Sequence, residues 1–351
     1  MSIIEIRNLR QKYTAGAVGV YNYNISCKDG EHICILAGKQ GGKTSLLKCI
    51  AGLLPAEEGE ILVNNIPIQD KRIKDRDLGI IFQDCGIIER RSIKWNLAYP
   101  LKIRKVPKEQ IANKVAQVAL DFKLIHLLSF SSSKLKECDK IRVAFARALI
   151  RNAPLLLIDN PFALLKGEER RELFIEMLPV IKGYKGNIFF ATDSIDEAFT
   201  LREKISILHY GILEQTGTIE QIKEQPATVQ VYKYAYGLSA NFTDTTLQKE
   251  REQLFVEILG QKLYLDNNLL LNDIYIGENV IAGFMIKEST KGKSVEINFC
   301  EQKEGQIYAH LILDGQKLIA PIPNFAQGEL AIEVLPASIR LYDVSNEKLI
   351  Y

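Results

Sequence analysis

Short apolar runs alternate with amphipathic segments through the first two-thirds of the chain. The apolar runs predict strands, and the run at residues 154–159 contains four consecutive leucine and isoleucine residues. Such a run is typical of a strand buried on both faces of a parallel sheet. Strands are predicted at residues 31–36, 79–82, 154–159 and 187–191, and helices at 43–53, 108–122, 138–151 and 168–181. This alternation indicates an α/β fold.

The pattern changes near residue 240, where strand-like segments follow one another and helical spacing becomes rare. Residues 307–313 and 316–321 flank Asp314-Gly315, which predicts a hairpin with a tight turn. Residues 288–294 carry a run of Lys, Ser and Thr around a glycine, which predicts a surface loop. We therefore expect a small, barrel-like antiparallel β domain at the end of the chain.

Composition places few further limits on function. The 351 residues are 47% hydrophobic and 25% charged, which fits a soluble chain of more than one domain. The net charge of +2 offers no argument for a nucleic-acid partner, and we expect none. The chain opens with a predicted strand, and no apolar stretch is long enough for a membrane helix, so a membrane role would require a partner. The six cysteines have no metal-site spacing, which predicts reduced and mostly buried thiols.

Residues 37–44 carry the strongest chemical signal in the sequence. They read Ala-Gly-Lys-Gln-Gly-Gly-Lys-Thr, a phosphate-binding P-loop with alanine at the first glycine position, between a predicted strand and a predicted helix. Backbone N–H groups of such a loop converge on an anion at the helix N-terminus. Lys43 would reach the β- and γ-phosphates of a nucleotide, and the Thr44 hydroxyl would bind Mg²⁺. The predicted nucleotide-contacting residues of the loop are Gly38, Gln40, Gly41, Gly42, Lys43, Thr44 and Ser45.

Asp159 supplies the second half of the predicted site. It ends the apolar run at 154–159, and a carboxylate there is costly unless a cation or hydrogen bonds compensate for its burial. A role as a Mg²⁺ partner accounts for this placement. The sequence therefore predicts a site for ATP and Mg²⁺.

Several segments together resemble the ATPases of the ATP-binding cassette family. Gln83 lies in a segment like the family Q-loop, residues 142–149 resemble the helix after the signature motif, and residues 159–162 resemble the end of the Walker B segment. Tyr13 lies where the family places an aromatic residue that stacks on adenine. The resemblance extends from about residue 3 to 240. At lower strength, residues 215–218, 282–287 and 335–343 resemble the maltose-type sugar importers and their OB-type regulatory domain.

The resemblance implies a P-loop NTPase domain at 1–238, with a helical subdomain at about 84–150, and an OB-type regulatory domain at 239–351. It implies a nucleotide-binding subunit at the cytoplasmic face of the membrane, working in a pair under two permease subunits and indirectly with an extracytoplasmic solute-binding protein. The segment from Gln83 through Asn96 would contact the permease subunits, and Trp95 and Ile93 beside two arginines suit such a surface. The family also implies that Gln83 joins Thr44 and Asp159 around the metal.

The sequence departs from the family at residues that serve hydrolysis. Asn160 stands where the family has the glutamate that accepts a proton from the attacking water, and an amide cannot take that proton. Asp193 stands where the family has a histidine, and a carboxylate there would repel the γ-phosphate. The signature segment reads Leu-Lys-Glu-Cys-Asp at 135–139 in place of Leu-Ser-Gly-Gly-Gln, and Lys166 replaces an aspartate in the D-loop. No catalytic residue of the family set is therefore intact.

The resemblance of the tail implies a carbohydrate importer. The altered motifs favour a subunit that binds ATP and drives or gates dimerisation under the permease subunits but hydrolyses ATP poorly, and that pairs with a second ATPase subunit in a heterodimer. Tolerated sequence drift is the alternative explanation of each change taken alone. A second hypothesis is an active transport ATPase in which Asp193 or another group replaces the missing base. A third is a regulatory module that acts on a signalling partner through its C-terminal domain.

Overall fold

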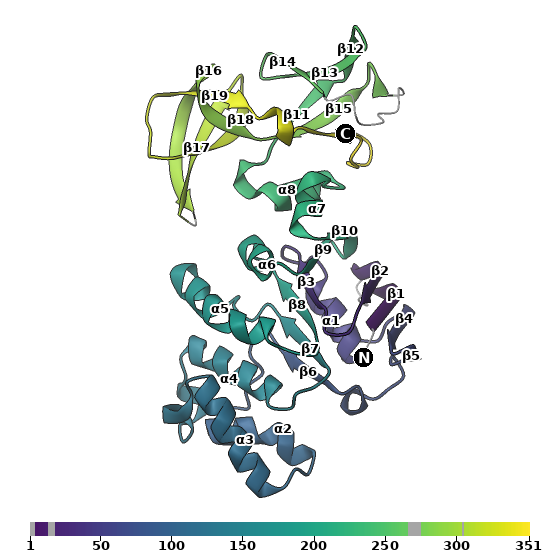
Figure 1. Ribbon diagram of the computed structural model, residues 1–351, viewed down its shortest axis with the longest axis vertical. Helices are drawn as coiled ribbons and strands as arrows, with labels where there is room; N and C mark the ends of the chain where they lie inside the picture. Colours follow the sequence, from purple (N-terminus) through teal and green to yellow (C-terminus); the bar gives the residue numbers. More distant parts are fainter. Residues whose placement is uncertain (1–3, 13–17, 266–274, 304) are drawn as a thin grey trace. The chain divides into compact units, whose positions relative to one another are not determined.

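The computed structural model describes residues 4–12, 18–265, 275–303 and 305–351 and divides into two units, Met1–Thr218 and Ile219–Tyr351 (Figure 1). Tyr13, the predicted adenine contact, lies outside the described residues. In the first unit, the strands are β1 Ile4–Lys12, β2 Val18–Cys27, β3 His32–Leu36, β4 Glu58–Val63, β5 Ile66–Pro67, β6 Leu78–Ile81, β7 Leu155–Asp159, β8 Asn187–Thr192, β9 Lys204–His209 and β10 Ile212–Gly217. Its helices are α1 Lys43–Ala51, α2 Ile93–Ile103, α3 Lys108–Asp121, α4 Glu137–Leu149, α5 Gly167–Lys182 and α6 Ile195–Leu201.

One sheet runs through the first unit in the order β5-β4-β1-β2-β10-β9-β3-β8-β7-β6. The strands β9, β3, β8, β7 and β6 are parallel, whereas β1 pairs with β2 and β4 in antiparallel fashion. Every residue of β3, β7 and β8 is buried, which is the pattern of strands covered on both faces. The α/β P-loop fold predicted from the apolar runs is confirmed.

The two faces of the parallel strands pack against different helices. Leu155 and Leu157 belong to one core cluster with Leu46 and Ile50 of α1. On the other face, Phe190 of β8 packs near Phe162, which also contacts aromatic rings of α4 and α5. This alternation places α1 on one side of the parallel strands and α4 and α5 on the other, as Figure 1 shows.

The parallel register aligns the carboxyl ends of four neighbouring strands. Leu36 at the end of β3 pairs with Thr192 at the end of β8, Asp159 at the end of β7 pairs with Ala191, and Ile81 at the end of β6 pairs with Ile158. The segments that follow these strands begin at one edge of the sheet. They contain the P-loop, Asp193, Asn160 and Gln83, so the fold gathers residues that are far apart in the sequence.

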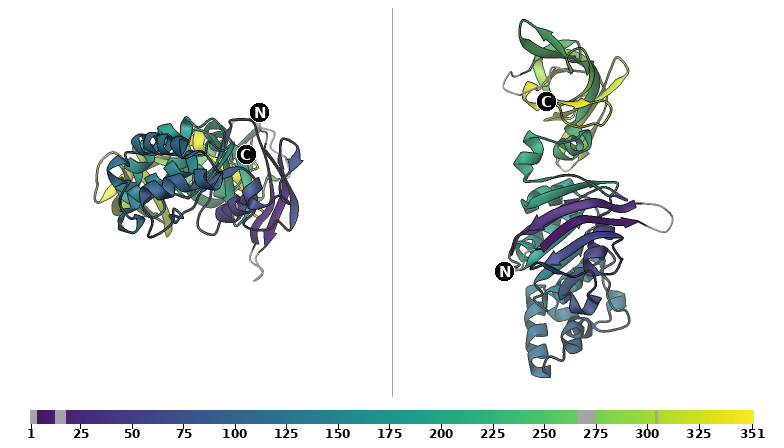
Figure 2. Two further views of the ribbon diagram at one scale, coloured as in Figure 1. Left: turned by 90° about the horizontal axis from the view of Figure 1, so that it is seen from below. Right: turned by 90° about the vertical axis from the view of Figure 1, so that its right-hand side faces the viewer.

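The second unit begins with α7 Ile219–Glu224 and α8 Val229–Tyr236 and continues as antiparallel strands that curve around a common core (Figure 2). The strands are β11 Asn241–Thr246, β12 Gln248–Glu250, β13 Gln253–Ile258, β14 Gln261–Tyr264, β15 Asn279–Phe284, β16 Ile286–Lys303, β17 Gln306–Leu313, β18 Gln316–Ile322, β19 Glu329–Val334 and β20 Arg340–Asp343. A small antiparallel β domain is thus confirmed. The hairpin β17–β18 turns at Asp314 and Gly315, which both have positive φ, as an Asp-Gly turn requires.

The two units meet at residues 218 and 219, twenty residues before the predicted boundary at 238 and 239. Aromatic packing explains why α8 clusters with the β domain. The ring of Tyr232 in α8 lies edge-on to Tyr342 and Phe242, and its hydroxyl donates a hydrogen bond to the carbonyl oxygen of Ser338 at 3.0 Å.

The surface loop predicted at 288–294 is wrong, because these residues lie within β16. Glu288 and Lys293 both pair with Ile332 of β19, so the intervening residues form a bulge in a continuous strand pair. Gly292 approaches the β19 backbone so closely that a Cβ atom there would lie 2.0 Å from the carbonyl oxygen of Ile332. The polar run and its glycine therefore mark a bulge and not a connection.

No helix in the described ranges is both long and apolar enough to cross a membrane.

Candidate functional site

The P-loop leaves β3 and enters α1 in a tightly packed backbone conformation. Gly42, which caps α1, has a φ of 95°, a left-handed conformation that favours glycine. A Cβ atom on Gly42 would lie 2.4 Å from the carbonyl oxygen of Gly19 and 2.9 Å from the Cα atom of Gly211. The N–H of Gly211 also donates to the carbonyl oxygen of Gly41 at 3.2 Å. Glycines from β2 and from the β9–β10 turn thus support the loop from outside.

Lys43 turns its ammonium group into the loop. Its Nζ atom donates to the carbonyl oxygens of Ala37 and Gly38 at 2.5 and 2.7 Å. Burial lowers the pKa of this ammonium group, and the nearby carboxylates of Asp193 and Asp159 partly offset the effect. A buried cation held by neutral carbonyl oxygens is suited to a phosphate, which would supply the missing negative charge.

Thr44 and Asp159, the two side chains predicted to hold Mg²⁺, lie together. The Thr44 hydroxyl donates to Oδ1 of Asp159 at 3.0 Å, and Asp159 is only 5% exposed. Burial raises the pKa of the Asp159 carboxyl, against the hydrogen bond from Thr44 and the charge of Lys43. A buried carboxylate beside a hydroxyl is an oxygen donor pair that fits Mg²⁺, whose charge would remove the cost of burial.

The remaining residues of the predicted nucleotide site surround this pair. Ser45 is buried in the first turn of α1, Gln40 has a φ of 59° and is exposed, and Gly41 packs against the Cβ atom of Ala37. Gln83 is exposed beyond the end of β6, next to the strand that ends in Asp159. The described contacts thus bring Lys43, Thr44 and Asp159 together and leave the Gln83 side chain apart from them.

Asn160 and Asp193, at the positions of the missing catalytic groups, also come together. Asn160 follows β7 with a φ of 44°, and its N–H donates to the carbonyl oxygen of Ala191 at 2.8 Å. Its side chain lies beside the Asp193 carboxylate and favours the ionised form of that group. Arg170 of α5 donates to Oδ1 of Asp193 at 2.8 Å and, through Nε, to Oε1 of Glu197 at 2.7 Å. Despite its burial, Asp193 has a lowered pKa because Arg170 and Asn160 stabilise the ionised form.

Arg170 is the residue of this cluster that sequence reasoning missed. The signal that could have revealed it is the spacing of Asp193 and Glu197, two carboxylates one helical turn apart, with Glu197 beside apolar residues of α6. Glu197 is 3% exposed, and a buried carboxylate needs a cation. Nothing in the sequence singled out residue 170 as that cation among the basic residues of the chain.

The altered signature segment forms the start of α4. Lys136 is the N-cap residue without a side-chain cap, and Glu137 and Asp139 lie in the first turn. Glu137 pairs with Lys140 at 2.7 Å, and Asp139 pairs with Arg142 at 2.8 Å. The helix N-terminus, which attracts anions, is therefore already faced by carboxylates of the chain itself.

The segment after Gln83 is only partly suited to be a contact surface. The guanidinium group of Arg91 lies 5.1 Å from the centre of the Trp95 ring, and Trp95 stacks on Tyr99. Ile93, expected to contribute to this surface, is the first residue of α2 and is fully buried. Asn96 is buried as well and donates to the carbonyl oxygens of Ile88 and Ser92.

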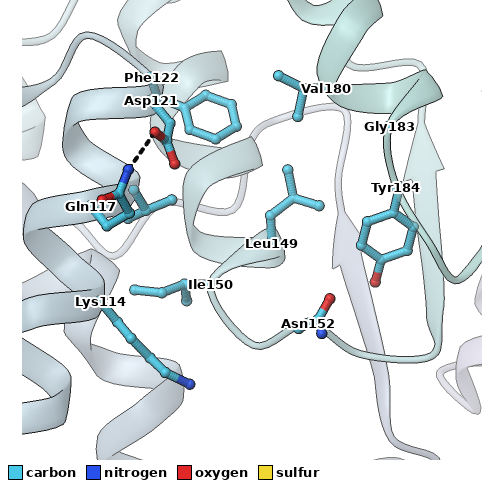
Figure 3. Close-up of a pocket in the computed structure, with 11 residues that line it drawn as sticks. Lys114, Gln117, Asp121, Phe122, Leu149, Ile150, Asn152, Val180, Gly183 and Tyr184 are labelled. Carbon is cyan, nitrogen blue, oxygen red and sulfur yellow. Dashed lines mark hydrogen bonds between the residues drawn. The ribbon is translucent and has the colours of Figure 1, made fainter.

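A separate open pocket lies away from the P-loop, between α3 and the ends of α4 and α5 (Figure 3). The residues that line it are Lys114, Gln117, Val118, Asp121, Phe122, Leu149, Ile150, Asn152, Val180, Gly183 and Tyr184. Gln117 uses its side-chain amide to donate to Asp121 at 2.8 Å, as the dashed line in Figure 3 marks. None of the predicted site residues belongs to this lining, so this pocket is not the predicted nucleotide site.

Comparison with known proteins agrees with the geometry of the P-loop edge. Residues 20–163 match the family model described as ABC transporter. The sn-glycerol-3-phosphate import ATP-binding protein UgpC of Bartonella bacilliformis is 30% identical over 256 residues, which are 73% of this chain and 74% of that protein. The protein of the same name from Bordetella avium is 32% identical over 231 residues, and the aligned part spans 66% of this chain and only 64% of the relative's length.

The trehalose import ATP-binding protein SugC of Mycobacterium tuberculosis H37Rv is 31% identical over 243 residues, covering 69% of this chain and 62% of the relative. Among solved structures, cbiO1 of Clostridium perfringens, described as part of the ABC transporter complex cbiONQ, aligns with a TM-score of 0.55. It is 25% identical and covers 61% of this chain and 88% of its own.

Proposed function

Because this chain belongs to the ABC transporter family, among its ATP-binding proteins, we propose that it is the nucleotide-binding subunit of an importer that binds ATP with Mg²⁺ and hydrolyses it poorly. The proposal rests on a contrast between two groups of residues in one site, those that would bind the nucleotide and those at the positions of the hydrolytic groups. Lys43, Thr44 and Asp159 are arranged to hold a nucleotide and a metal. At the positions of the missing hydrolytic groups, in contrast, Asn160 carries no proton acceptor and Asp193 is paired with Arg170.

The proposed chemistry follows from the residues of this chain. Lys43 and the backbone N–H groups of the loop bind the phosphates, and Thr44 and Asp159 hold the metal, which screens charge between the β- and γ-phosphates. Asn160 cannot accept a proton from water at neutral pH. Asp193 is ionised, but Arg170 occupies one of its oxygens, and its lowered pKa makes it a weak base. These features count against the alternative of an active ATPase that uses Asp193 as the base.

We assign the subunit to the cytoplasmic face of the membrane, under two permease subunits that it contacts through the segment from Gln83 to Asn96. The rings of Trp95 and Tyr99 beside Arg91 support such a contact. Arg147 of α4 donates to the carbonyl oxygens of Cys85 and Gly86 at 2.9 and 2.7 Å. Because these hydrogen bonds join the segment to α4, a movement of the segment would displace α4. The solute, delivered by an extracytoplasmic binding protein, is a carbohydrate or a similarly hydroxylated compound, because the similar proteins import trehalose and sn-glycerol-3-phosphate.

The subunit is proposed to pair with a second ATPase subunit. A homodimer would contain two sites that each lack the base and face an altered signature segment. In a heterodimer, the P-loop of this chain would meet an intact signature, and the partner's site would retain its own base. Affinity purification of the full chain from its native host tests this point. Recovery of a second ATP-binding subunit is expected, and recovery of permease subunits with this chain as the only ATPase would overturn the pairing.

Binding and turnover of ATP by the purified full chain test the central proposal. We expect saturable binding of ATP with Mg²⁺ and turnover close to the uncatalysed background. The Lys43→Ala variant provides the reference for loss of binding. A high rate of hydrolysis that disappears in Lys43→Ala would contradict the proposal and support the active ATPase.

A regulatory role of the C-terminal β domain is the remaining alternative. Its strands β15 and β20 pair in the two segments that resemble the regulatory domain of the maltose-type importers, with Ala282 opposite Leu341. Truncation after residue 218 separates the two roles. Retained ATP binding with loss of a signalling partner would favour regulation through this domain.

A further inference from the structure

Basic residues are concentrated in one stretch of a chain whose charges otherwise balance. The whole chain has 45 Lys and Arg residues against 43 Asp and Glu residues. Residues 90–108 contain no acidic residue, and the nearest acidic residues in the sequence are Glu89 and Glu109 at its two ends. The basic residues of this stretch are Arg90, Arg91, Lys94, Lys102, Arg104, Lys105 and Lys108. Such a local excess of one sign produces a positive potential that the small net charge of the chain conceals.

The helix α2 within this stretch has one buried side and one exposed side. Ile93, Leu97 and Leu101 recur at helical spacing and are buried where α2 packs against α3 and α4. The opposite side presents two apolar side chains to solvent, because Tyr99 is 36% exposed and Ile103 is 63% exposed. The exposed side of α2 is therefore both apolar and basic.

The aromatic and basic side chains on this exposed side contact one another. The ring of Trp95 stacks on that of Tyr99, with their centres 4.7 Å apart. The Arg91 guanidinium group lies 5.1 Å from the centre of the Trp95 ring, and the Lys102 ammonium group lies 5.9 Å from it. Rings flanked by Arg and Lys form one continuous surface along the helix. This composition is typical of the interface between a membrane and water.

The basic surface continues around the turn from α2 to α3. The N–H of Lys105, whose φ is 58°, donates to the carbonyl oxygen of Lys102 at 3.0 Å, so the turn remains close to the end of α2. Lys108 is the first residue of α3, and Figure 1 shows α2 and α3 together at one end of the first unit. Within the described residues, Arg104 is the one member of the basic stretch that forms an ion pair, with Asp77.

These features together narrow the chemistry of a partner. A solvated helix face accounts for lysines alone, but it does not account for exposed Tyr99 and Ile103 among cations that lack carboxylate partners. A bilayer with anionic headgroups offers negative charge above an apolar layer. Long lysine side chains can reach the headgroups while neighbouring apolar side chains enter the boundary of the acyl region. The charge and the exposed apolar groups of α2 are complementary to such a surface.

We propose that the exposed side of α2 and the α2–α3 turn bind the surface of a membrane that contains anionic phospholipids. Lys102, Lys105 and Lys108 contact the headgroups, and Tyr99 and Ile103 enter the interface. This inference rests on the proposed position of the subunit at the membrane. It goes beyond the proposed permease contact, which extends only to Asn96, and it requires no bound nucleotide.

Cosedimentation of the full chain with lipid vesicles tests the proposal. We expect binding to vesicles of phosphatidylcholine with about 30% phosphatidylglycerol, whose headgroup is anionic, and little binding to phosphatidylcholine alone. Binding should be lost as the salt concentration rises to about 1 M, where the screening length falls to about 3 Å. Absence of binding to the anionic vesicles at low salt would overturn the proposal.

A triple variant measures the contribution of the basic residues. Lys102→Gln, Lys105→Gln and Lys108→Gln together should weaken binding about 100-fold, since each lysine contributes about fivefold, or about 1 kcal/mol. The matched control removes three exposed lysines elsewhere in the first unit, by the substitutions Lys28→Gln, Lys71→Gln and Lys185→Gln. Binding by the control close to that of the wild type supports the assignment. Equal losses in the two triple variants would show that binding depends on net charge and would overturn it.

A single substitution tests the apolar part of the surface. Ile103→Ser should weaken vesicle binding about tenfold, because an isoleucine side chain no longer enters the interface. Ile175→Ser, which replaces an isoleucine of α5 that is 50% exposed, is the control and should bind like the wild type. Unfolding midpoints equal to that of the wild type would confirm that the variants are folded. Equal binding by Ile103→Ser and the wild type would contradict insertion of this side chain.

Two further measurements separate the lipid surface from other partners and from the proposed function. Loss of copurifying permease subunits in the Lys102, Lys105 and Lys108 variant, with unchanged vesicle binding, would overturn the assignment to lipid and indicate a protein partner. Titration of the same variant with ATP should give the affinity of the wild type. Vesicle binding by a wild-type chain that does not bind ATP would support this inference and contradict only the proposed function.

Discussion

The N-termini of α1 and α4 belong to the same unit and offer the same backbone chemistry, but their side chains use it differently. No acidic residue lies in the first turn of α1, and its capping residue Gly42 leads directly into the phosphate loop. The first turn of α4 carries Glu137 and Asp139, each paired with a basic residue of the same helix. A helix N-terminus attracts anions. The N-terminus of α1 is available to a ligand anion, whereas that of α4 already interacts with carboxylates of the same helix.

The contrast indicates how an anion-binding helix can lose that capacity without losing its fold. The backbone of α4 is a regular helix that packs Phe145 against Phe162. Only the side chains of its first turn are unsuited to a phosphate, because two of them are acidic. Four measurements, from the largest expected effect to the smallest, would sharpen or break this contrast.

Removal of the buried ammonium group should have the largest effect. Lys43→Ala is expected to weaken ATP binding by about 100-fold, since a charge-assisted hydrogen bond contributes about 1.5–3 kcal/mol and each 1.4 kcal/mol is a factor of ten. Isothermal titration calorimetry of the purified chain measures the affinity. Lys48→Ala, which removes a lysine from the last turn of the same helix, is the control and should bind nearly as well as the wild type. Equal losses of ATP affinity in both variants would contradict a specific role of the α1 N-terminus.

Asp159→Asn tests the metal side of the same edge. The substitution retains the size of the side chain and its contact with Thr44 but removes the charge. We expect about a tenfold loss of ATP affinity in the presence of Mg²⁺, because one charged oxygen ligand is lost, and little change when the metal is chelated. An equal loss in both conditions would indicate a structural effect and not a metal contact.

The ion pair that joins α4 to α5 leads to a prediction about how stability depends on pH. Arg142 donates to both carboxylate oxygens of Glu176, and these hydrogen bonds lower the pKa of Glu176. Because the folded-state pKa lies below the ordinary value of about 4.3, the contribution to stability is present above that pH and is lost as the pH falls through the folded-state value. Glu176→Gln is expected to lower the free energy of unfolding by about 1 kcal/mol at neutral pH, given partial solvent exposure.

Denaturant unfolding at a series of pH values checks this expectation. The difference between wild type and Glu176→Gln should shrink as the pH falls below about 4. A difference that is the same at pH 7 and in acid would show that the charge of Glu176 does not stabilise the packing of α4.

The smallest expected effect lies at the first turn of α4. Glu137→Gln and Asp139→Asn remove the carboxylates that compete for the helix N-terminus. Each should lower the free energy of unfolding by about 0.3–1 kcal/mol, because favourable interactions with the helix dipole are lost. The double variant should nevertheless associate more strongly in the presence of ATP, as sedimentation measurements would detect. Unchanged association would mean that charge at this turn is not what separates α4 from α1.

The sequence was informative where one interaction dominates. The run at 154–159 and the loop at 37–44 predicted β7, α1 and the contact between Thr44 and Asp159, because burial and phosphate chemistry each impose a specific pattern. The hairpin at Asp314 and Gly315 was equally clear, since few residue pairs adopt that turn.

The sequence was not informative where the outcome depends on contacts between distant segments. Arg170 is one of many basic residues, and only the fold places it between Asp193 and Glu197. The polar residues 288–294 lacked the alternation of a strand because a bulge interrupts their pairing with β19. Ile93 belonged to a segment with the composition of a contact surface, but the first turn of α2 buries it.

The packing of Gly42 against Gly19 and Gly211 bears on how this site could have changed over evolutionary time. The phosphate loop takes its support from β2 and the β9–β10 turn, whereas Asn160 and Asp193 follow β7 and β8. The phosphate loop and the pair of Asn160 and Asp193 therefore rest on different strands, although Asp159 of the binding part also ends β7. Replacements at Asn160 and Asp193 therefore leave the packing of Gly42 against Gly19 and Gly211 in place and need no compensating change there.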